Sequence, residues 1–346
     1  MKAFTIGCRG TSLDIEERAF LRAERPWGLI LFGRNVGTEL ELSRLVENFR
    51  RAVDDERAPV LIDQEGGRVQ RLRPPFAPDY PANAELGRIY LADPEAGLRA
   101  TYLLSRLHAF DLGRFGIDID CLPVLDVPVP GANAVIGDRA FGPSPEHVAA
   151  LGRAACQGLL DGGVLPVIKH MPGHGRANAD SHKALPTVSC TLETLDTHDF
   201  VPFRALADMP IGMSAHVRFT SIDPERPASV SPIVIETVIR QRLGFDGLLL
   251  SDDVAMNALS GDTATRTREL LAAGCDIALH CSGDLEDAVE AAEVTPELGG
   301  AALKRADRAL ARRQIPDDAS ETELRAEFRA LTGRNVDRPG YASRAA

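Results

Sequence analysis

Eight short apolar runs, separated by helix-like segments, constrain the fold of this chain most strongly. The runs cover residues 4–7, 28–32, 59–62, 118–124, 165–168, 211–214, 247–250 and 276–279. Several runs are apolar on both faces, which is typical of a parallel sheet covered by helices. Amphipathic stretches lie between them at residues 40–53, 95–115, 147–158, 192–207, 232–243 and 265–273. This alternation predicts parallel strands joined by crossover helices.

The number of units favours a closed (β/α)8 TIM barrel over an open, doubly wound sheet. The loop after the first run also lacks the GxGxxG turn that binds phosphate in dinucleotide-binding folds. A length of 346 residues suits one barrel with additions better than two small independent domains. We therefore expect a single catalytic barrel over residues 1–315. A C-terminal extension over residues 316–346 should then hold one polar helix, at 317–332, and a tail.

Composition excludes several classes of partner. Acidic residues outnumber basic residues, 50 to 39, and no block of Lys or Arg marks a nucleic-acid footprint. No apolar stretch approaches the roughly 20 residues that span a bilayer, and the first ten residues lack the apolar run of a signal peptide. The six cysteines have no CxxC spacing, which disfavours a disulfide or zinc framework. We expect a cytoplasmic protein with no membrane or nucleic-acid partner. We also expect a monomer.

Ionisable residues follow four of the eight predicted strands. Catalytic residues of a parallel barrel lie at the carboxyl ends of its strands and in the loops that follow. Here these positions hold Asp63, Lys169, His170, His216, Asp252 and Asp253. Any one of them alone would be interpreted as a helix cap or a solvent-exposed charge. Together they predict a polar mouth whose carboxylates and cations can hold pairs of sugar hydroxyls.

The loop after the fifth run is long, polar and rich in glycine. Proline and glycine residues within 172–175 prevent a helix, so the spacing of His170 and His174 is not that of a zinc pair on one helical face. A metal site remains an alternative. Asp180 and His182 are two residues apart, close enough for the carboxylate to fix the imidazole tautomer and raise its basicity.

Six motifs, in this order, resemble those of the β-N-acetylglucosaminidases of glycoside hydrolase family 3, in the branch that recycles peptidoglycan in the cytosol. The motifs occupy residues 61–71, 135–141, 169–175, 180–182, 214–216 and 251–253. The resemblance covers nearly the whole chain. It implies a glycosidase with a barrel fold and with neither a metal nor another cofactor.

The resemblance also implies a role for individual residues. Asp252 matches the nucleophile, His182 the histidine general acid/base, and Asp180 the partner of that histidine. The groups that hold the terminal sugar match Asp63, Arg71, Arg139, Lys169 and His170.

Two positions depart from the family pattern. Met171 stands where Phe is usual, and Arg176-Ala177-Asn178-Ala179 stands where a Gly-Asp-Thr type of segment is usual. Neither departure touches a residue expected to transfer a proton, but both could alter how the loop closes.

The residues alone leave several roles open. Adjacent side chains on a strand point to opposite faces, so strand phase does not choose between Asp252 and Asp253. We interpret Asp253 as the N-cap of a helix-like segment at 254–259. We interpret His216 as a buried, hydrogen-bonded histidine and Glu65 as a structural acceptor.

The implied activity is the removal of a terminal β-linked N-acetylglucosamine through a glycosyl-aspartate intermediate, with retention of configuration. The implied substrates are muropeptides in which N-acetylglucosamine is linked β-1,4 to 1,6-anhydro-N-acetylmuramic acid. A phosphorylase is an alternative, because a neutral histidine repels phosphate less than a glutamate does. A metal-dependent hydrolase and a catalytically silent sugar-binding regulator are further alternatives. The intact set of Asp252, Asp180 and His182 argues against the regulator.

Overall fold

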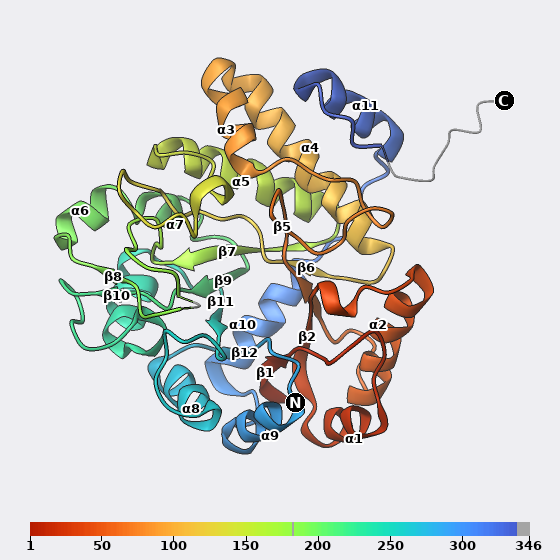
Figure 1. Ribbon diagram of the computed structural model, residues 1–346, viewed down its shortest axis with the longest axis vertical. Helices are drawn as coiled ribbons and strands as arrows, with labels where there is room; N and C mark the ends of the chain where they lie inside the picture. Colours follow the sequence, from red (N-terminus) through yellow and green to blue (C-terminus); the bar gives the residue numbers. More distant parts are fainter. Residues whose placement is uncertain (182, 338–346) are drawn as a thin grey trace.

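Eight parallel strands close into a barrel in the computed structural model of the protein, which describes residues 1–181 and 183–337 (Figure 1). The barrel strands are β1 (Lys2–Ile6), β2 (Pro26–Leu31), β3 (Val60–Ile62), β6 (Ile119–Asp120), β7 (Leu165–Met171), β9 (Ile211–Ser214), β11 (Leu248–Asp253) and β12 (Ile277–His280). Strand β1 pairs with both β2 and β12, which closes the sheet. The predicted (β/α)8 barrel is confirmed, and each predicted apolar run overlaps one strand.

Helices connect the strands and surround the barrel (Figure 1). They are α1 (Ile15–Glu24), α2 (Glu39–Val53), α3 (Asn83–Ala92), α4 (Pro94–Gly113), α5 (Pro145–Asp161), α6 (Leu192–Thr197), α7 (Val201–Ala205), the wider π-type helix η4 (Val234–Arg242), α8 (Thr263–Ala273) and α9 (Leu285–Val294). The prediction of one helix over 192–207 is wrong, because α6 ends before His198. Pro202 has no N–H to continue that helix and lies instead in the first turn of α7, where proline is tolerated.

Apolar side chains pack on both faces of the barrel strands. Neighbouring residues alternate between the barrel interior and the layer under the helices, as the pleat of a strand requires. The interior cluster includes Leu61, Ile119, Val167, Met213, Leu250 and Leu279. The outer cluster includes Val60, Ile62, Ile168, Leu249 and Ala278. This double burial explains why the strands are apolar at nearly every position.

Helix α10 (Gly300–Ala311) covers the amino end of the barrel. Its Ala306 and Ala309 belong to the interior apolar cluster. Arg305 pairs with Asp276 at the start of β12, 3.0 Å away. The amino end is therefore closed by packing, which leaves the carboxyl end for a functional site.

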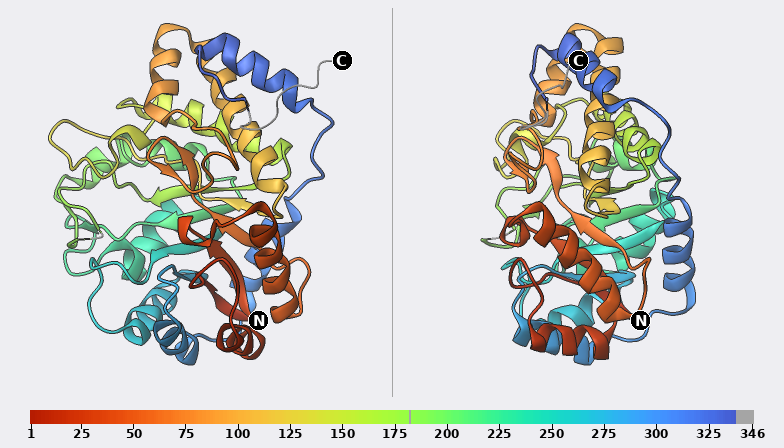
Figure 2. Two further views of the ribbon diagram at one scale, coloured as in Figure 1. Left: turned by 45° about the vertical axis from the view of Figure 1, so that its right-hand side comes forward. Right: turned by 90° about the vertical axis from the view of Figure 1, so that its right-hand side faces the viewer.

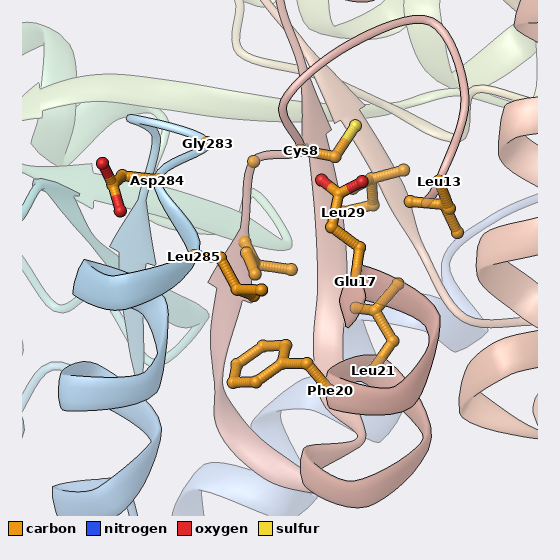
Figure 3. A pocket seen from close by; sticks show the side chains of 11 residues that line it. Cys8, Leu13, Glu17, Phe20, Leu21, Leu29, Gly283, Asp284 and Leu285 are labelled. Carbon is orange, nitrogen blue, oxygen red and sulfur yellow. The ribbon is translucent and has the colours of Figure 1, made fainter. Parts of the chain in front are cut away.

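A small cavity lies between α1 and the start of α9 (Figure 3). Its volume of about 10 Å³ is close to that of one water, which is far too small for a substrate. The Glu17 carboxylate beside it accepts hydrogen bonds from the amides of Arg9 and Asp14, at 2.9 and 3.0 Å. Glu17 therefore completes the capping box of α1, and this cavity is a packing feature.

Helix α11 (Glu321–Thr332) lies outside the barrel, beside α3 and α4 in both views of Figure 2. It falls within the helix predicted over 317–332 and begins four residues later, because Ser320 caps its first turn. Among the residues described, no helix is both long and apolar enough to cross a membrane.

Candidate active site

A cavity of about 390 Å³ opens at the carboxyl ends of the barrel strands. Seven of the eight predicted site residues line it, namely Asp63, Arg71, Arg139, Lys169, His170, Asp180 and Asp252. The eighth, His182, lies outside the described residues. Strand ends and loops far apart in the sequence therefore meet at one mouth, as the (β/α)8 architecture predicts.

Two carboxylates and three cations alternate along one side of this cavity, and all of them except Glu65 line it. Lys169 Nζ lies 2.8 Å from Asp63 Oδ1 and 2.6 Å from Glu65 Oε1, and the lysine side chain is 2% exposed. Arg71 Nη2 donates to the second oxygen of Asp63 at 3.0 Å. Arg139 binds both oxygens of Glu65, each at 2.8 Å. Each charge is therefore compensated inside the protein.

The pKa values of these groups follow from this compensation. Burial disfavours the ionised form of Asp63, but Lys169 and Arg71 outweigh it and hold the pKa well below its ordinary value. Burial likewise opposes ionisation of Glu65, while Arg139 and Lys169 lower its pKa to about 2. The two carboxylates raise the pKa of Lys169 against the effect of burial. All of these groups are charged at neutral pH and can hold polar ligand groups in fixed directions.

A short hairpin, β4 (Gln64–Gly66) and β5 (Val69–Gln70), carries part of this wall. Gly66 and Gly67 both have positive φ, 91° and 58°, in the tight turn between the strands. A Cβ atom on Gly66 would lie 2.3 Å from the carbonyl oxygen of Pro81. The two glycines of the 61–71 motif are therefore required by the turn and by the chain packed against it.

Asp126, which the sequence analysis missed, organises the two histidines at this end of the barrel. Its Oδ2 lies 2.7 Å from His170 Nδ1, and its Oδ1 accepts from the amide of His174 at 2.6 Å. Burial opposes ionisation of Asp126, but His170 and His174 lower its pKa. An ionised Asp126 fixes the proton on Nδ1 of His170. In the sequence, Asp126 could have been recognised as a carboxylate that directly follows the apolar residues 121–125.

Asp252 is buried at the end of β11, with 7% of its surface exposed. Burial favours its neutral form, but His216 and His170 and the amide of Asp253, 2.9 Å from Oδ1, lower its pKa. Asp252 is therefore ionised at neutral pH, which is the state that a nucleophile requires.

Asp253 does not cap a helix, so that prediction is wrong. Residues 254–259 form turns. The Oδ1 atom of Asp253 accepts from the amides of Ala255 and Cys281, both at 3.0 Å. The carboxylate thus caps a turn and ties the end of β11 to the end of β12.

His216 is fully buried behind Asp252. Its Nε2 lies 2.9 Å from the carbonyl oxygen of Asp253, which can only accept, so Nε2 carries the proton. Its Nδ1 then accepts from the hydroxyl of Ser229 at 2.6 Å. Burial also lowers the pKa of His216. The geometry agrees with a neutral, hydrogen-bonded histidine in a structural role.

The loop after β7 is anchored on both sides of Asp180. Arg176 Nε donates to Asp199 at 2.5 Å, and the amide of Ala258 donates to the carbonyl oxygen of Ser181 at 3.1 Å. Met171, the other departure from the family pattern, is fully buried in the apolar core. That departure therefore concerns packing beneath the site.

Within residues 1–181 and 183–337, no group of three His, Cys, Asp or Glu side chains is arranged to hold a metal ion.

The chain is similar to known proteins over most of its length. A profile of the glycosyl hydrolase family 3 N-terminal domain matches residues 10–312. The chain is 41% identical over 277 residues to a beta-hexosaminidase of Methylococcus capsulatus, covering 79% of this chain and 80% of the relative.

Two solved structures are similar over nearly the whole chain. NagZ from Neisseria gonorrhoeae, in complex with N-trifluoroacetyl-D-glucosamine, superposes with a TM-score of 0.83 at 31% identity, covering 96% of each chain. A glycoside hydrolase family 3 β-N-acetylglucosaminidase from Paenibacillus superposes with a TM-score of 0.79 at 29% identity. That match covers 95% of this chain but 61% of the longer Paenibacillus chain.

Proposed function

The chain belongs to glycoside hydrolase family 3 and is a glycosidase, and we propose that it removes a terminal β-linked N-acetylglucosamine with retention of configuration. One observation carries the proposal: an ionised, buried Asp252 lines the same cavity as the charged wall of Asp63, Arg71, Arg139 and Lys169. The names of the similar proteins from Methylococcus and Neisseria support this choice of sugar.

In the first proposed step, a carboxylate oxygen of Asp252 attacks the anomeric carbon of the sugar. The bond to the leaving group breaks, and its oxygen takes a proton from the imidazolium of His182. In the second step the neutral imidazole takes a proton from water. The resulting oxygen attacks the anomeric carbon and releases Asp252. Two inversions give net retention.

A histidine differs from the second carboxyl group that retaining glycosidases usually place about 5–5.5 Å from the nucleophile. Its ordinary pKa of about 6.5 suits alternate acid and base roles near neutral pH. Asp180, which lines the cavity two residues before His182, is proposed to fix the tautomer of that imidazole. No deep burial is needed to tune the proton donor.

Asp63, Arg71, Arg139, Lys169 and His170 are proposed to hold the terminal sugar. Asp63 and the cations on either side of it offer acceptors and donors that match pairs of vicinal hydroxyls. Asp126 contacts Nδ1 of His170, so Nε2 is the ring nitrogen left to contact a sugar hydroxyl.

We further propose that the natural substrates are muropeptides carrying N-acetylglucosamine β-1,4-linked to 1,6-anhydro-N-acetylmuramic acid, met in the cytoplasm during cell-wall recycling. A monomer without a cofactor is sufficient for this chemistry. Light scattering would test the monomer, and turnover of purified muropeptides would test the substrate.

The decisive assay compares a chromogenic β-N-acetylglucosaminide with the matching β-glucoside. We expect turnover of the first at least about tenfold faster, and none by the Asp252→Ala variant. Faster turnover of the glucoside would overturn the choice of sugar. Formation of a sugar 1-phosphate in phosphate buffer would identify a phosphorylase, and loss of activity with a chelator would identify a metal-dependent hydrolase.

A further inference from the structure

A buried polar cluster joins the C-terminal helix α11 to the segment that follows the β4–β5 hairpin. Arg325 donates to the Tyr80 hydroxyl at 3.1 Å, to Asp111 at 2.9 Å and to Glu321 at 2.9 Å. The Tyr80 hydroxyl in turn donates to the other oxygen of Asp111. Tyr80, Asp111 and Arg325 are all buried, so each depends on the others to satisfy its polar atoms.

Tyr80 is bound directly to the hairpin through its backbone. Its carbonyl oxygen accepts from the amide of Gly67 at 2.9 Å, and its amide donates to Gln70 Oε1 at 3.1 Å. A Cβ atom on Gly67 would lie 2.7 Å from the Cβ atom of Ala82. The chain around Tyr80 therefore packs on the hairpin turn with no free space, and a shift of one must move the other.

The hairpin in turn places the charged wall of the cavity. The side chain of Gln64 accepts a hydrogen bond from the backbone amide of Arg71 at 3.0 Å. This bond fixes the position of the Arg71 backbone and therefore the direction of its side chain. Glu65 lies within β4 and holds both Arg139 and Lys169. A displacement of the hairpin by a fraction of an ångström would change these ion pairs.

We propose that α11 positions the sugar-binding wall, with Arg325 and Tyr80 as positioning residues. This inference rests on the proposed function, because it takes Asp63, Arg71 and their partners to bind the sugar. Helix α11 lies beyond residues 10–312, the part of the chain that matches the family profile. Helix α11 thus supports the binding site, and it also packs beside α3 and α4 (Figure 2).

Two other ion pairs between the extension and the body of the protein provide matched controls. Arg99 binds Glu327 at 2.6 and 2.7 Å, and Arg334 binds Glu85. Neither pair touches Tyr80. A variant of either pair loosens the extension without breaking the connection to the hairpin.

The test measures KM and kcat for a chromogenic β-N-acetylglucosaminide, together with the affinity for free N-acetylglucosamine. Tyr80→Phe removes one hydroxyl and keeps the ring. We expect KM to rise about 3- to 10-fold and kcat to stay within about twofold of the wild type. The hairpin positions the residues proposed to bind the sugar, whereas the nucleophile Asp252 lies on a different strand, β11. Arg325→Met should raise KM further, and Arg325→Lys should restore part of the loss.

Tyr102→Phe is the control for loss of a hydroxyl, since the Tyr102 hydroxyl donates to Asp161 at 2.9 Å and not to Asp111. Arg99→Gln is the control for a loosened extension. Both should keep the KM of the wild type.

An unchanged KM and sugar affinity in Tyr80→Phe and Arg325→Lys, with only a lower melting temperature, would show that α11 stabilises the fold and nothing more. If Arg325→Met does not fold, the KM and sugar affinity of Tyr80→Phe still test the positioning role. A wild-type protein that turns over no N-acetylglucosaminide would remove the proposed function itself, and the positioning role with it.

Discussion

Arg176 donates a hydrogen bond from its Nε to the carboxylate of Asp199, at 2.5 Å. Asp199 is 2% exposed, so this carboxylate depends for compensation on Arg176 and on His198, whose Nδ1 lies 3.3 Å from it. Burial raises the pKa of Asp199, and Arg176 opposes that rise. Arg176 belongs to the segment that departs from the family pattern. The departure therefore provides an anchor that holds the loop just ahead of Asp180.

Replacing Arg176 by Ala should loosen this loop and lower kcat for substrates with a sugar leaving group. Loss of the arginine leaves buried Asp199 with His198 alone, which should also lower the free energy of unfolding by about 1–3 kcal/mol. Hydrogen exchange should show faster exchange of the amides around 176–184, with the barrel strands unchanged. Arg153→Ala breaks an exposed pair with Asp208 and should change none of these three quantities. Exchange equal to that of the wild type in Arg176→Ala would contradict the anchor.

Replacing Asp252 by Ala should abolish turnover while the melting temperature stays near that of the wild type, because its carboxylate faces the cavity. Asp253→Ala should instead lower the free energy of unfolding by about 1–3 kcal/mol, since two amides lose their acceptor. Kinetics and thermal melting of both variants separate the two roles. An inactive Asp253→Ala beside an active Asp252→Ala would exchange them.

The barrel could be predicted because its information is local. Several strands are short runs that are apolar on both faces, and six of the eight runs are followed by an amphipathic stretch, so the periodicity indicates parallel strands and crossover helices. Residues that meet at the carboxyl ends could be predicted for the same reason, since the architecture fixes which strand ends converge.

The errors concern contacts between segments far apart in the sequence. Asp253 has the local pattern of an N-cap, but its carboxylate also accepts from the amide of Cys281, just after the next strand, and turns replace the helix. Asp126 is an isolated carboxylate in the sequence, and its role becomes visible only when His170 and His174 fold against it. Likewise, no local pattern connects Arg325 with Tyr80, which lie far apart along the chain.

Acid should destabilise the protein partly through Glu65. Its pKa is about 2 in the folded protein, against an ordinary value of 4.5. Because the folded pKa is the lower one, this carboxylate contributes stability above pH 4.5, and the contribution is lost as the pH falls from 4.5 toward 2. Urea unfolding across that range should show a shallower dependence on pH for Glu65→Gln than for the wild type. Parallel curves for the two proteins would mean that the Arg139 and Lys169 pairs do not stabilise the fold in this way.

Replacing His182 by Ala should harm substrates with poor leaving groups far more than activated ones. A nitrophenolate leaves with little protonation, so Asp252 can be glycosylated without the acid, whereas a sugar alkoxide is too basic to leave unaided. The loss of rate should therefore grow with the pKa of the leaving group. A series of aryl N-acetylglucosaminides beside a disaccharide measures this dependence.

The same imidazole must deprotonate water in the second step, so azide should partly restore turnover by His182→Ala. Azide attacks the glycosyl-aspartate without needing a base and gives a glycosyl azide that can be isolated. Asp180→Ala should show a weaker form of both effects, because the imidazole remains but is less well oriented and less basic. If His182→Ala slows all leaving groups equally and azide has no effect, the proton comes from another group. His174 is then the next candidate, because it lines the cavity and its buried Nδ1 has no hydrogen-bond partner within the described chain.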